Sequence, residues 1–240
     1  MNVKKAMNRT KIMLICIIVL IAINGCAVYY PQVVDIPLIK EKGDIRLDGG
    51  LFVAPGSESK EGADPAGSHV TISAGLTNVI AVQGYVNVDF LLNGYAQGAL
   101  GLFKGFDNNA VIELYSGYGF GGGGLESENK EDHYYKNLDY HLPFVQFNIG
   151  KTDVGSSHID YGLALKGGYL YTKYFKYKEP EPIYKEGWMF EPSLFFRIGG
   201  SRVKFSTKVN YQWTKVIEDE SYFPLSVSMG INFRLGKTSK

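Results

Sequence analysis

The stretch VKFSTKVNYQW, residues 203–213, decides the fold. Its odd-numbered residues are apolar, aromatic or β-branched, and its even-numbered residues are polar. A period of two predicts a β-strand with two unlike faces, because successive side chains of a strand point to opposite sides. In a soluble sheet the apolar face packs inside, whereas in a membrane barrel it meets lipid. The class of the protein therefore depends on which face is turned outward.

Nine further stretches alternate in the same way, and hardly any helical pattern competes with them. The ten predicted strands are residues 44–54, 68–77, 79–90, 95–104, 110–120, 142–150, 158–174, 188–198, 203–215 and 224–235. Lengths near ten residues match a tilted transmembrane β-strand. Pro192 predicts a bulge or a break in its strand, because proline has no N–H to donate to the sheet.

The connections between these strands alternate in length. Short links are predicted at 77–78, 105–109, 151–157 and 199–202, and long polar links at 55–67, 121–141 and 176–187. Short turns at one rim and long loops at the other are typical of a transmembrane barrel with its short side in the periplasm.

The polar faces of the strands suit a lumen better than a solvated surface. They are rich in glycine, alanine and serine, which fit a crowded interior. They also carry six basic and five acidic residues, which must pair inside a narrow barrel because unpaired buried charge is costly. The predicted lumen charge network consists of Arg46, Asp48, Asp89, Glu113, Asp160, Lys166, Glu191, Arg197, Lys204, Lys208 and Arg234.

Aromatic residues on the apolar faces gather in two groups. The group near the long links is Phe90, Tyr118, Phe120, Tyr169, Tyr171, Trp188, Phe190, Tyr211 and Trp213. The group toward the other rim is Phe147, Tyr161, Phe196, Phe205 and Phe233. Two aromatic belts are expected of a barrel that spans a membrane and not of a soluble one.

The last strand adds a resemblance. Its sequence SMGINFRL, residues 228–235, resembles the C-terminal insertion signal of bacterial outer-membrane barrels, although Leu235 and a short tail replace the usual terminal aromatic residue. With the pattern over residues 44–235, the chain resembles small bacterial outer-membrane β-barrel proteins. The resemblance implies an all-β fold, an antiparallel up-and-down transmembrane barrel of about ten strands.

The N-terminus is typical of a bacterial leader. Residues 4–11 are basic, and residues 12–23 form an apolar run too short to span a bilayer. The run ends in INGC, residues 23–26, which resembles the lipobox of lipoproteins and implies cleavage before Cys26 and acylation of its thiol. An ordinary secretory leader is the alternative. The expected segments are a signal peptide at 1–25, a lipidated N-terminus and extended tether at 26–43, and the barrel at 44–240.

Four residues are weak candidates for a metal or catalytic site. His69, His133 and His141 map to the long-loop side, where Asp132 and other acidic residues also lie. Imidazole and carboxylate groups bind divalent metals or act as acids and bases. Their spacing matches no diagnostic pattern, and a solvated acidic loop explains the same residues.

The sequence favours a binding or structural role in the envelope of a Gram-negative cell. Without the leader the chain has 21 basic and 24 acidic residues, so nothing indicates nucleic-acid binding. Ten strands are too few for a general diffusion pore, so we expect the extracellular loops to act in adhesion, ligand binding or envelope integrity. The expected partners are outer-membrane lipid, the barrel-assembly and lipoprotein-processing machinery and an extracellular ligand, with no cofactor and a lipid anchor on the periplasmic side. A lipid-anchored, lipocalin-like carrier and an outer-membrane hydrolase are the alternatives.

Overall fold

The strands form almost the whole of the described chain. The computed structural model describes residues 33–54, 66–90, 93–123, 135–176, 181–214, 216 and 225–236. Within these ranges there is no helix, and so none that is long and apolar enough to cross a membrane. The strands are β1 (Ile45–Val53), β2 (Ala66–Gly75), β3 (Ile80–Asp89), β4 (Gly94–Gly105), β5 (Ala110–Gly123), β6 (Tyr135–Val154), β7 (Ile159–Lys176), β8 (Ile183–Gly199), β9 (Val203–Tyr211), β10 (Trp213–Thr214) and β11 (Leu225–Arg234).

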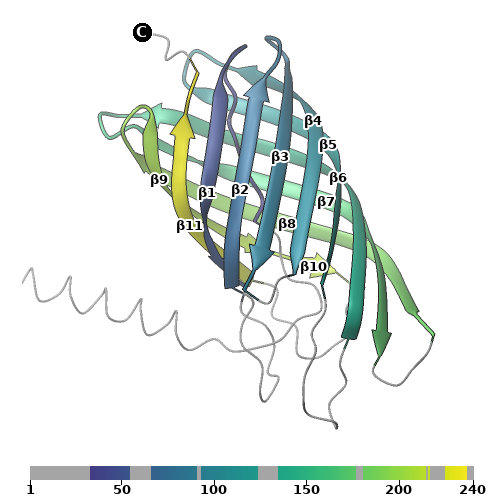
Figure 1. Cartoon of the computed structure of the whole chain (residues 1–240). Helices are drawn as coiled ribbons and strands as arrows, with labels where there is room; N and C mark the ends of the chain where they lie inside the picture. Colours follow the sequence, from purple (N-terminus) through teal and green to yellow (C-terminus); the bar gives the residue numbers. More distant parts are fainter. Residues whose placement is uncertain are drawn as a thin grey trace, which may run out of the picture.

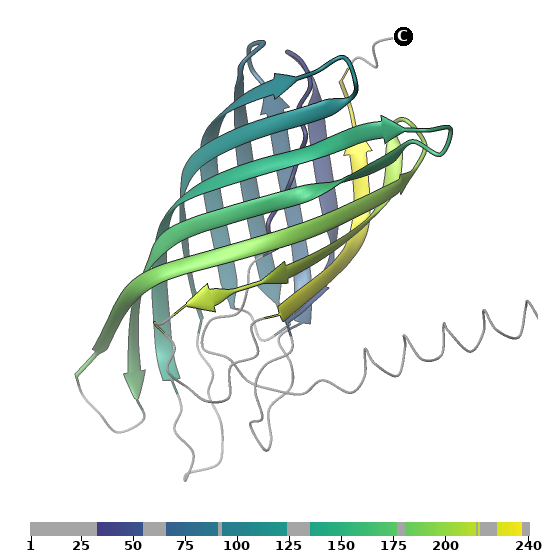
Figure 2. The same ribbon diagram turned by 180° about the vertical axis from the view of Figure 1, so that it is seen from behind.

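The strands close into one antiparallel barrel (Figures 1 and 2). Each strand from β1 to β8 pairs with the next, and β11 pairs with both β9 and β1 to complete the ring. The two-residue β10 follows β9 along the same edge of β8, so the barrel has ten strands in up-and-down order. The predicted all-β, antiparallel up-and-down barrel of about ten strands is confirmed.

Pro192 accounts for the division between β9 and β10. β8 pairs with β9 from Ser193 onward, and it pairs with β10 through Met189 and Phe190. The two ladders share one register, and the interval between them contains Pro192. Of the two predicted outcomes, the structure therefore has a local break and not a bulge. Proline has no N–H, so a backbone carbonyl oxygen of β9 receives no hydrogen bond from this position.

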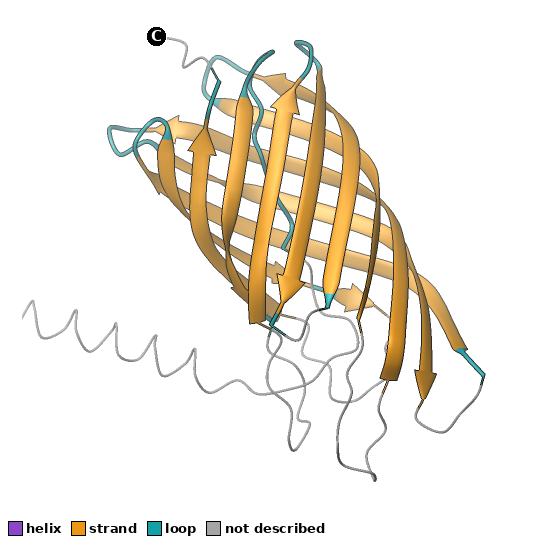
Figure 3. Ribbon diagram, in the orientation of Figure 1, coloured by secondary structure: helices purple, strands orange, loops and turns teal. Residues whose placement is uncertain are grey.

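The two rims of the barrel differ in the length of their links, as the sequence predicted. Short links at 76–79, 106–109, 155–158 and 200–202 form one rim, which we call the turn rim (Figure 3). The other rim, which we call the loop rim, carries the links that follow β1, β3, β5, β7 and β10. Most residues of the long links lie outside the described part of the chain.

β6 and β8 are longer than predicted and project past the loop rim (Figures 1 and 2). β6 begins at Tyr135, where the alternation predicted a start at 142. In its added part the polarity of the two faces is reversed, since Asp139 and His141 are exposed while Tyr140 is buried. The reversed pattern hid this part of the strand from a search for outward apolar residues.

The barrel is apolar outside and polar inside. On β9, Val203, Phe205 and Val209 are exposed, whereas Lys204 and Lys208 are at most 2% exposed. All fourteen aromatic residues of the two predicted groups lie on the outer face, thirteen of them classed as exposed and Tyr169 as half-buried. The large buried polar side chains lie on the opposite face of the same strands. This is the reverse of a soluble globule, in which apolar side chains fill the interior.

Candidate functional site

Residues 33–44, which we call the inner segment, run through the lumen of the barrel. The segment hydrogen-bonds to strands on every side: Val33 to β3, Val34 to β9, Ile39 to β5 and Leu38 to β1. A chain that contacts opposite walls of a closed ring lies inside it, and Figure 3 shows it there as a loop between the strands. These residues are irregular, as expected of a tether, but the lumen encloses them.

The inner segment runs in the direction opposite to β1. Val33 packs with Phe52 and Tyr95, which lie at the ends of β1 and β4 nearest the loop rim. Asp44 precedes β1 at the turn rim, where Gly43 donates its N–H to the carbonyl oxygen of Gly75 at 2.8 Å. The chain therefore enters the described lumen from its loop-rim half and turns into β1 at the turn rim.

Apolar burial holds the inner segment in place. Five of its side chains, those of Val33, Val34, Ile36, Leu38 and Ile39, are at most 1% exposed. Burial of such a side chain contributes about 1.5–3 kcal/mol, so the five together contribute on the order of 10 kcal/mol. The segment is therefore a well-packed part of the folded interior.

Small residues of the wall make room for the segment. A Cβ at Gly75 would lie 2.5 Å from the carbonyl oxygen of Glu41 and 2.9 Å from Cγ2 of Ile39. A Cβ at Gly105 would lie 3.0 Å from the carbonyl oxygen of Lys40. These inward glycines thus serve the close approach of a second backbone.

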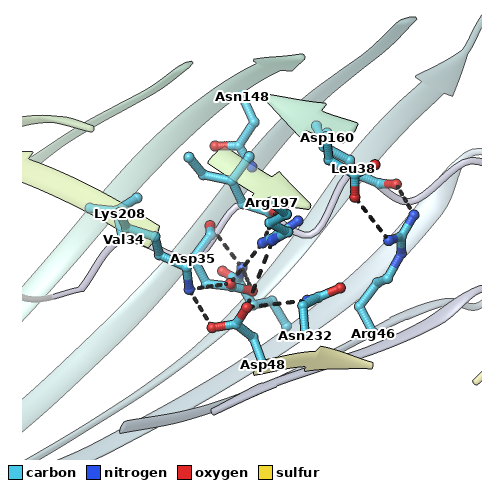
Figure 4. Close-up of polar contacts among 12 residues, drawn as sticks. Val34, Asp35, Leu38, Arg46, Asp48, Asn148, Asp160, Arg197, Lys208 and Asn232 are labelled. Atoms are coloured by element: carbon cyan, nitrogen blue, oxygen red, sulfur yellow. Dashed lines mark hydrogen bonds and ion pairs between the residues drawn. The ribbon is translucent and has the colours of Figure 1, made fainter. Parts of the chain in front are cut away.

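Asp35 joins the inner segment to the charged wall (Figure 4). Its carboxylate lies 3.1 Å from Nζ of Lys208 and 3.7 Å from Nη2 of Arg197. Its backbone carbonyl accepts a hydrogen bond of 2.7 Å from Gln146. Arg197 also donates to the carbonyl oxygen of Ile36 at 2.7 Å.

Asp48 of β1 is the wall's own partner for the same two bases. It lies 2.6 Å from Nζ of Lys208 and 3.7 Å from Nε of Arg197. Asn232 donates a hydrogen bond of 3.2 Å to it, and Nε2 of His69 lies at 3.3 Å. Two carboxylates, one from the segment and one from the wall, therefore share two buried cations.

A second cluster closes the turn rim around Asp44. Its carboxylate accepts two hydrogen bonds from Arg234, at 3.0 and 3.1 Å, and lies 3.5 Å from Arg46. Lys204 pairs with Asp153 at 2.7 Å and also with Asp160. Because paired and hydrogen-bonded charge is the form that burial tolerates, this cluster seals the rim without free charge at its centre.

All eleven residues of the predicted lumen network face the interior and are buried. Seven of them meet in the two clusters just described: Arg46, Asp48, Asp160, Arg197, Lys204, Lys208 and Arg234. Lys166 and Glu191 form a separate pair at 3.6 Å. Glu113 accepts hydrogen bonds from the Ile39 N–H and Asn148, and Asp89 accepts two from Asn93.

The half of the lumen near the loop rim is mainly aromatic and aliphatic, with the Lys166–Glu191 pair beside the rings. Its buried cluster contains Val33, Phe52, Ala54, Tyr85, Tyr95, Tyr140, Leu142, Phe144, Leu170, Tyr174, Met189 and Val216. Nζ of Lys166 lies 4.6 Å from the centre of the Phe144 ring and 5.6 Å from that of Tyr95. Paired charged side chains, aromatic side chains and the inner segment thus fill the described lumen.

The predicted metal candidates do not come together in the described chain. His69 is buried in the lumen beside Asp48, whereas His141 is exposed on the outer face and lies 2.8 Å from the Tyr118 hydroxyl. The described residues contain no group of three or more His, Cys, Asp or Glu residues placed to hold a metal ion. His133, Asp132 and Cys26 lie outside the described residues.

Sequence reasoning missed Asp35, which lies in the expected tether, and Asp44, which it placed at the start of the first strand without assigning it to the network. The available signal was the apolar density of VVDIPLI, residues 33–39, which is high for a solvated tether. No protein-family model matches the chain, and a search of curated proteins finds no significant match.

Proposed function

We propose that this protein is a sealed barrel of the bacterial outer membrane that acts through its loop rim. The observation that carries the proposal is the reversed polarity of the wall, with Phe205 and Val209 exposed and Lys204 and Lys208 buried on the same strand. An exposed belt of large apolar side chains around a closed ring is costly in water and favourable in lipid.

The height of the apolar belt supports this environment. Val203 and Trp213, both exposed, are ten residues apart on the row formed by β9 and β10. At about 3.3 Å per residue and a tilt near 40°, this row is roughly 25 Å tall, which matches the apolar band of outer-membrane barrels. At the loop rim, Asp139 and His141 begin a polar outer face, as expected above the lipid boundary.

The filled lumen favours a role outside the barrel. The inner segment, the charge clusters and the aromatic cluster occupy the described interior, so solutes have no evident path through it. Adhesion, ligand binding or envelope integrity, carried by the loops and by the projecting ends of β6, β7 and β8, fits this arrangement. We propose a non-catalytic role for the same reason.

Acylation of Cys26 would attach the chain to lipid beside the loop rim. Val33 lies in the loop-rim half of the lumen, seven positions after Cys26. Seven residues reach about 25 Å at most. Since the inner segment already fills the way to the turn rim, the position of Val33 favours the outer leaflet over the periplasmic one that the sequence suggested.

Two alternatives are weighed against the same geometry. A soluble carrier needs an apolar lumen around free space, whereas the described apolar side chains of the lumen pack on one another and on Val33. A hydrolase at the loop rim would need His133 or His141, and their replacement by alanine would abolish turnover of its substrate. No second function is favoured by a specific contact.

The test is a charge on the outer face of the wall. Val209→Arg places a cation at mid-strand where lipid would lie, and we expect it to weaken assembly by about 2–4 kcal/mol. The measurement is the difference in migration between boiled and unboiled samples on a denaturing gel, together with recovery in the outer-membrane fraction. Val209→Ala, at the same position without charge, is the control.

A folded wild-type barrel should shift on boiling and remain with the outer membrane, and Val209→Arg should reduce the shifted fraction. Equal assembly of the two variants, or release of the wild-type protein from membranes when the acyl anchor is removed, would instead favour a soluble barrel.

A further inference from the structure

The inner segment supplies the negative charge that balances one side of the lumen. The wall residues of the two clusters are five basic and three acidic: Arg46, Arg197, Lys204, Lys208 and Arg234 against Asp48, Asp153 and Asp160. Five minus three gives the wall residues of these two clusters a formal charge of +2, and Glu113, which accepts a hydrogen bond from the Ile39 N–H, lies outside both clusters. Asp35 and Asp44 of the inner segment bring the sum to zero.

These basic groups line the path of the segment, with the wall carboxylates Asp48, Asp160 and Glu113 among them. Lys208 and Arg197 contact Asp35 at mid-lumen, and Arg46 and Arg234 contact Asp44 at the turn rim. Arg46 and Arg197 also donate to main-chain carbonyl oxygens of the segment, at 3.4 and 2.7 Å. The wall thus offers successive donors to carboxylate and carbonyl oxygens, which is how proteins bind anions.

Removal of the segment would leave a passage as wide as the chain that filled it. An extended chain occupies about 5 Å by 10 Å in cross-section, counting the spacing of strands and of packed sheets. Such a passage admits small ions and excludes most larger solutes.

We propose that the inner segment is a plug bound in an anion-binding track, and that the barrel without it is a narrow channel selective for small anions. The inference rests on the proposed membrane-spanning barrel. In the intact protein Asp35 and Asp44 occupy the track as tethered anions, so the channel is closed.

The experiment compares the mature chain with a variant that lacks residues 27–44, which end directly before β1, both assembled in planar bilayers. With potassium chloride as the probe in a concentration gradient, the intact protein should show no steady conductance. The deleted variant should conduct, and its reversal potential should lie toward the equilibrium potential of chloride. In the deleted variant, the double substitution Lys208→Gln and Arg197→Gln should abolish most of the selectivity for chloride over potassium. Lys104→Gln, on the outer face, should leave this selectivity unchanged.

A synthetic peptide with the sequence of residues 33–44 provides an independent readout. Added to the open variant, it should close the channel, and the same peptide with Asp35→Asn should need about tenfold more to do so, since a charged hydrogen bond contributes about 1.5–3 kcal/mol. A block by both peptides at equal concentration would overturn the role of Asp35.

The boiled-gel shift separates the two proposals. If the wild-type protein does not assemble in membranes, the result contradicts the proposed function itself and not only the plug. If only the deleted variant fails, a full chain with Asp44→Asn and a protease site between Lys42 and Gly43, both exposed at the turn rim, is assembled, cut and washed free of residues 27–42. An assembled barrel without its plug that does not conduct, or that prefers potassium, would overturn the inference.

Discussion

Lys208 lies between two carboxylates that are hidden from water. Asp35 and Asp48 are each 2% exposed, and both depend on this ammonium group and on Arg197 for compensation. From the sequence alone, a lysine on the lumen face is replaceable if its partners stay solvated. In the structure the carboxylate partners of Lys208 are not solvated, because the plug covers them.

We therefore expect Lys208→Ala to be strongly destabilising. It leaves excess buried negative charge, and breaking a buried pair in this way costs about 3–5 kcal/mol. Guanidinium unfolding of the protein in lipid vesicles, followed by tryptophan fluorescence, measures the loss. Lys104→Ala, which removes an exposed lysine from the outer face of β4, should change the unfolding free energy by about 0.5 kcal/mol or less. Similar losses in the two variants would contradict the pairing.

At the scale of the strand, the alternation of apolar and polar residues was sufficient to predict a strand wherever its outer face is apolar. It predicted all ten strands of the barrel, their order and the alternation of short and long links. It missed the first residues of β6 because Asp139 and His141 reverse the polarity of the faces there. It could not find the inner segment at all, since a chain enclosed by walls on all sides needs no alternation.

The break opposite Pro192 gives a prediction for the ladder between β8 and β9. Pro192→Val adds an N–H donor at an outward position, so we expect β9 and β10 to join into one strand. One backbone hydrogen bond contributes about 0.5–1.5 kcal/mol. Hydrogen exchange at Gln212 and its neighbours should slow in the variant. Unchanged exchange there would mean that the break has a cause other than the missing donor.

At the scale of the whole molecule, the candidate site is a property of the closed ring and not of any one strand. The sequence placed eleven charges on the lumen face, and all of them are buried. Which of them pair could not be predicted, because ion pairs such as Lys208 with Asp35 join residues 173 positions apart. The plug was beyond reach for the same reason: its partners are spread over six strands.

The direction of the plug predicts where the N-terminus is accessible. An epitope tag inserted between Cys26 and Val33 should be detected by antibody on intact cells, because Val33 lies in the loop-rim half of the lumen. The same tag in the turn at 155–158 should be detected only after the outer membrane is opened. Detection of both tags only in opened cells would place the N-terminus on the periplasmic side and contradict the direction proposed for the anchor.

The position of the plug also fixes an order of events during biogenesis. The plug precedes β1, and the ring closes where β1 meets β11, the last strand to be synthesised. A segment joined to β1 and enclosed by the finished ring must lie in the interior before that seam forms, or else its free end must enter the lumen through an open rim. Contacts such as Asp44 with Arg234, 190 residues apart, form only at this final step. The first residues of the barrel therefore reach their native surroundings only when the last ones arrive, and folding waits for the complete chain.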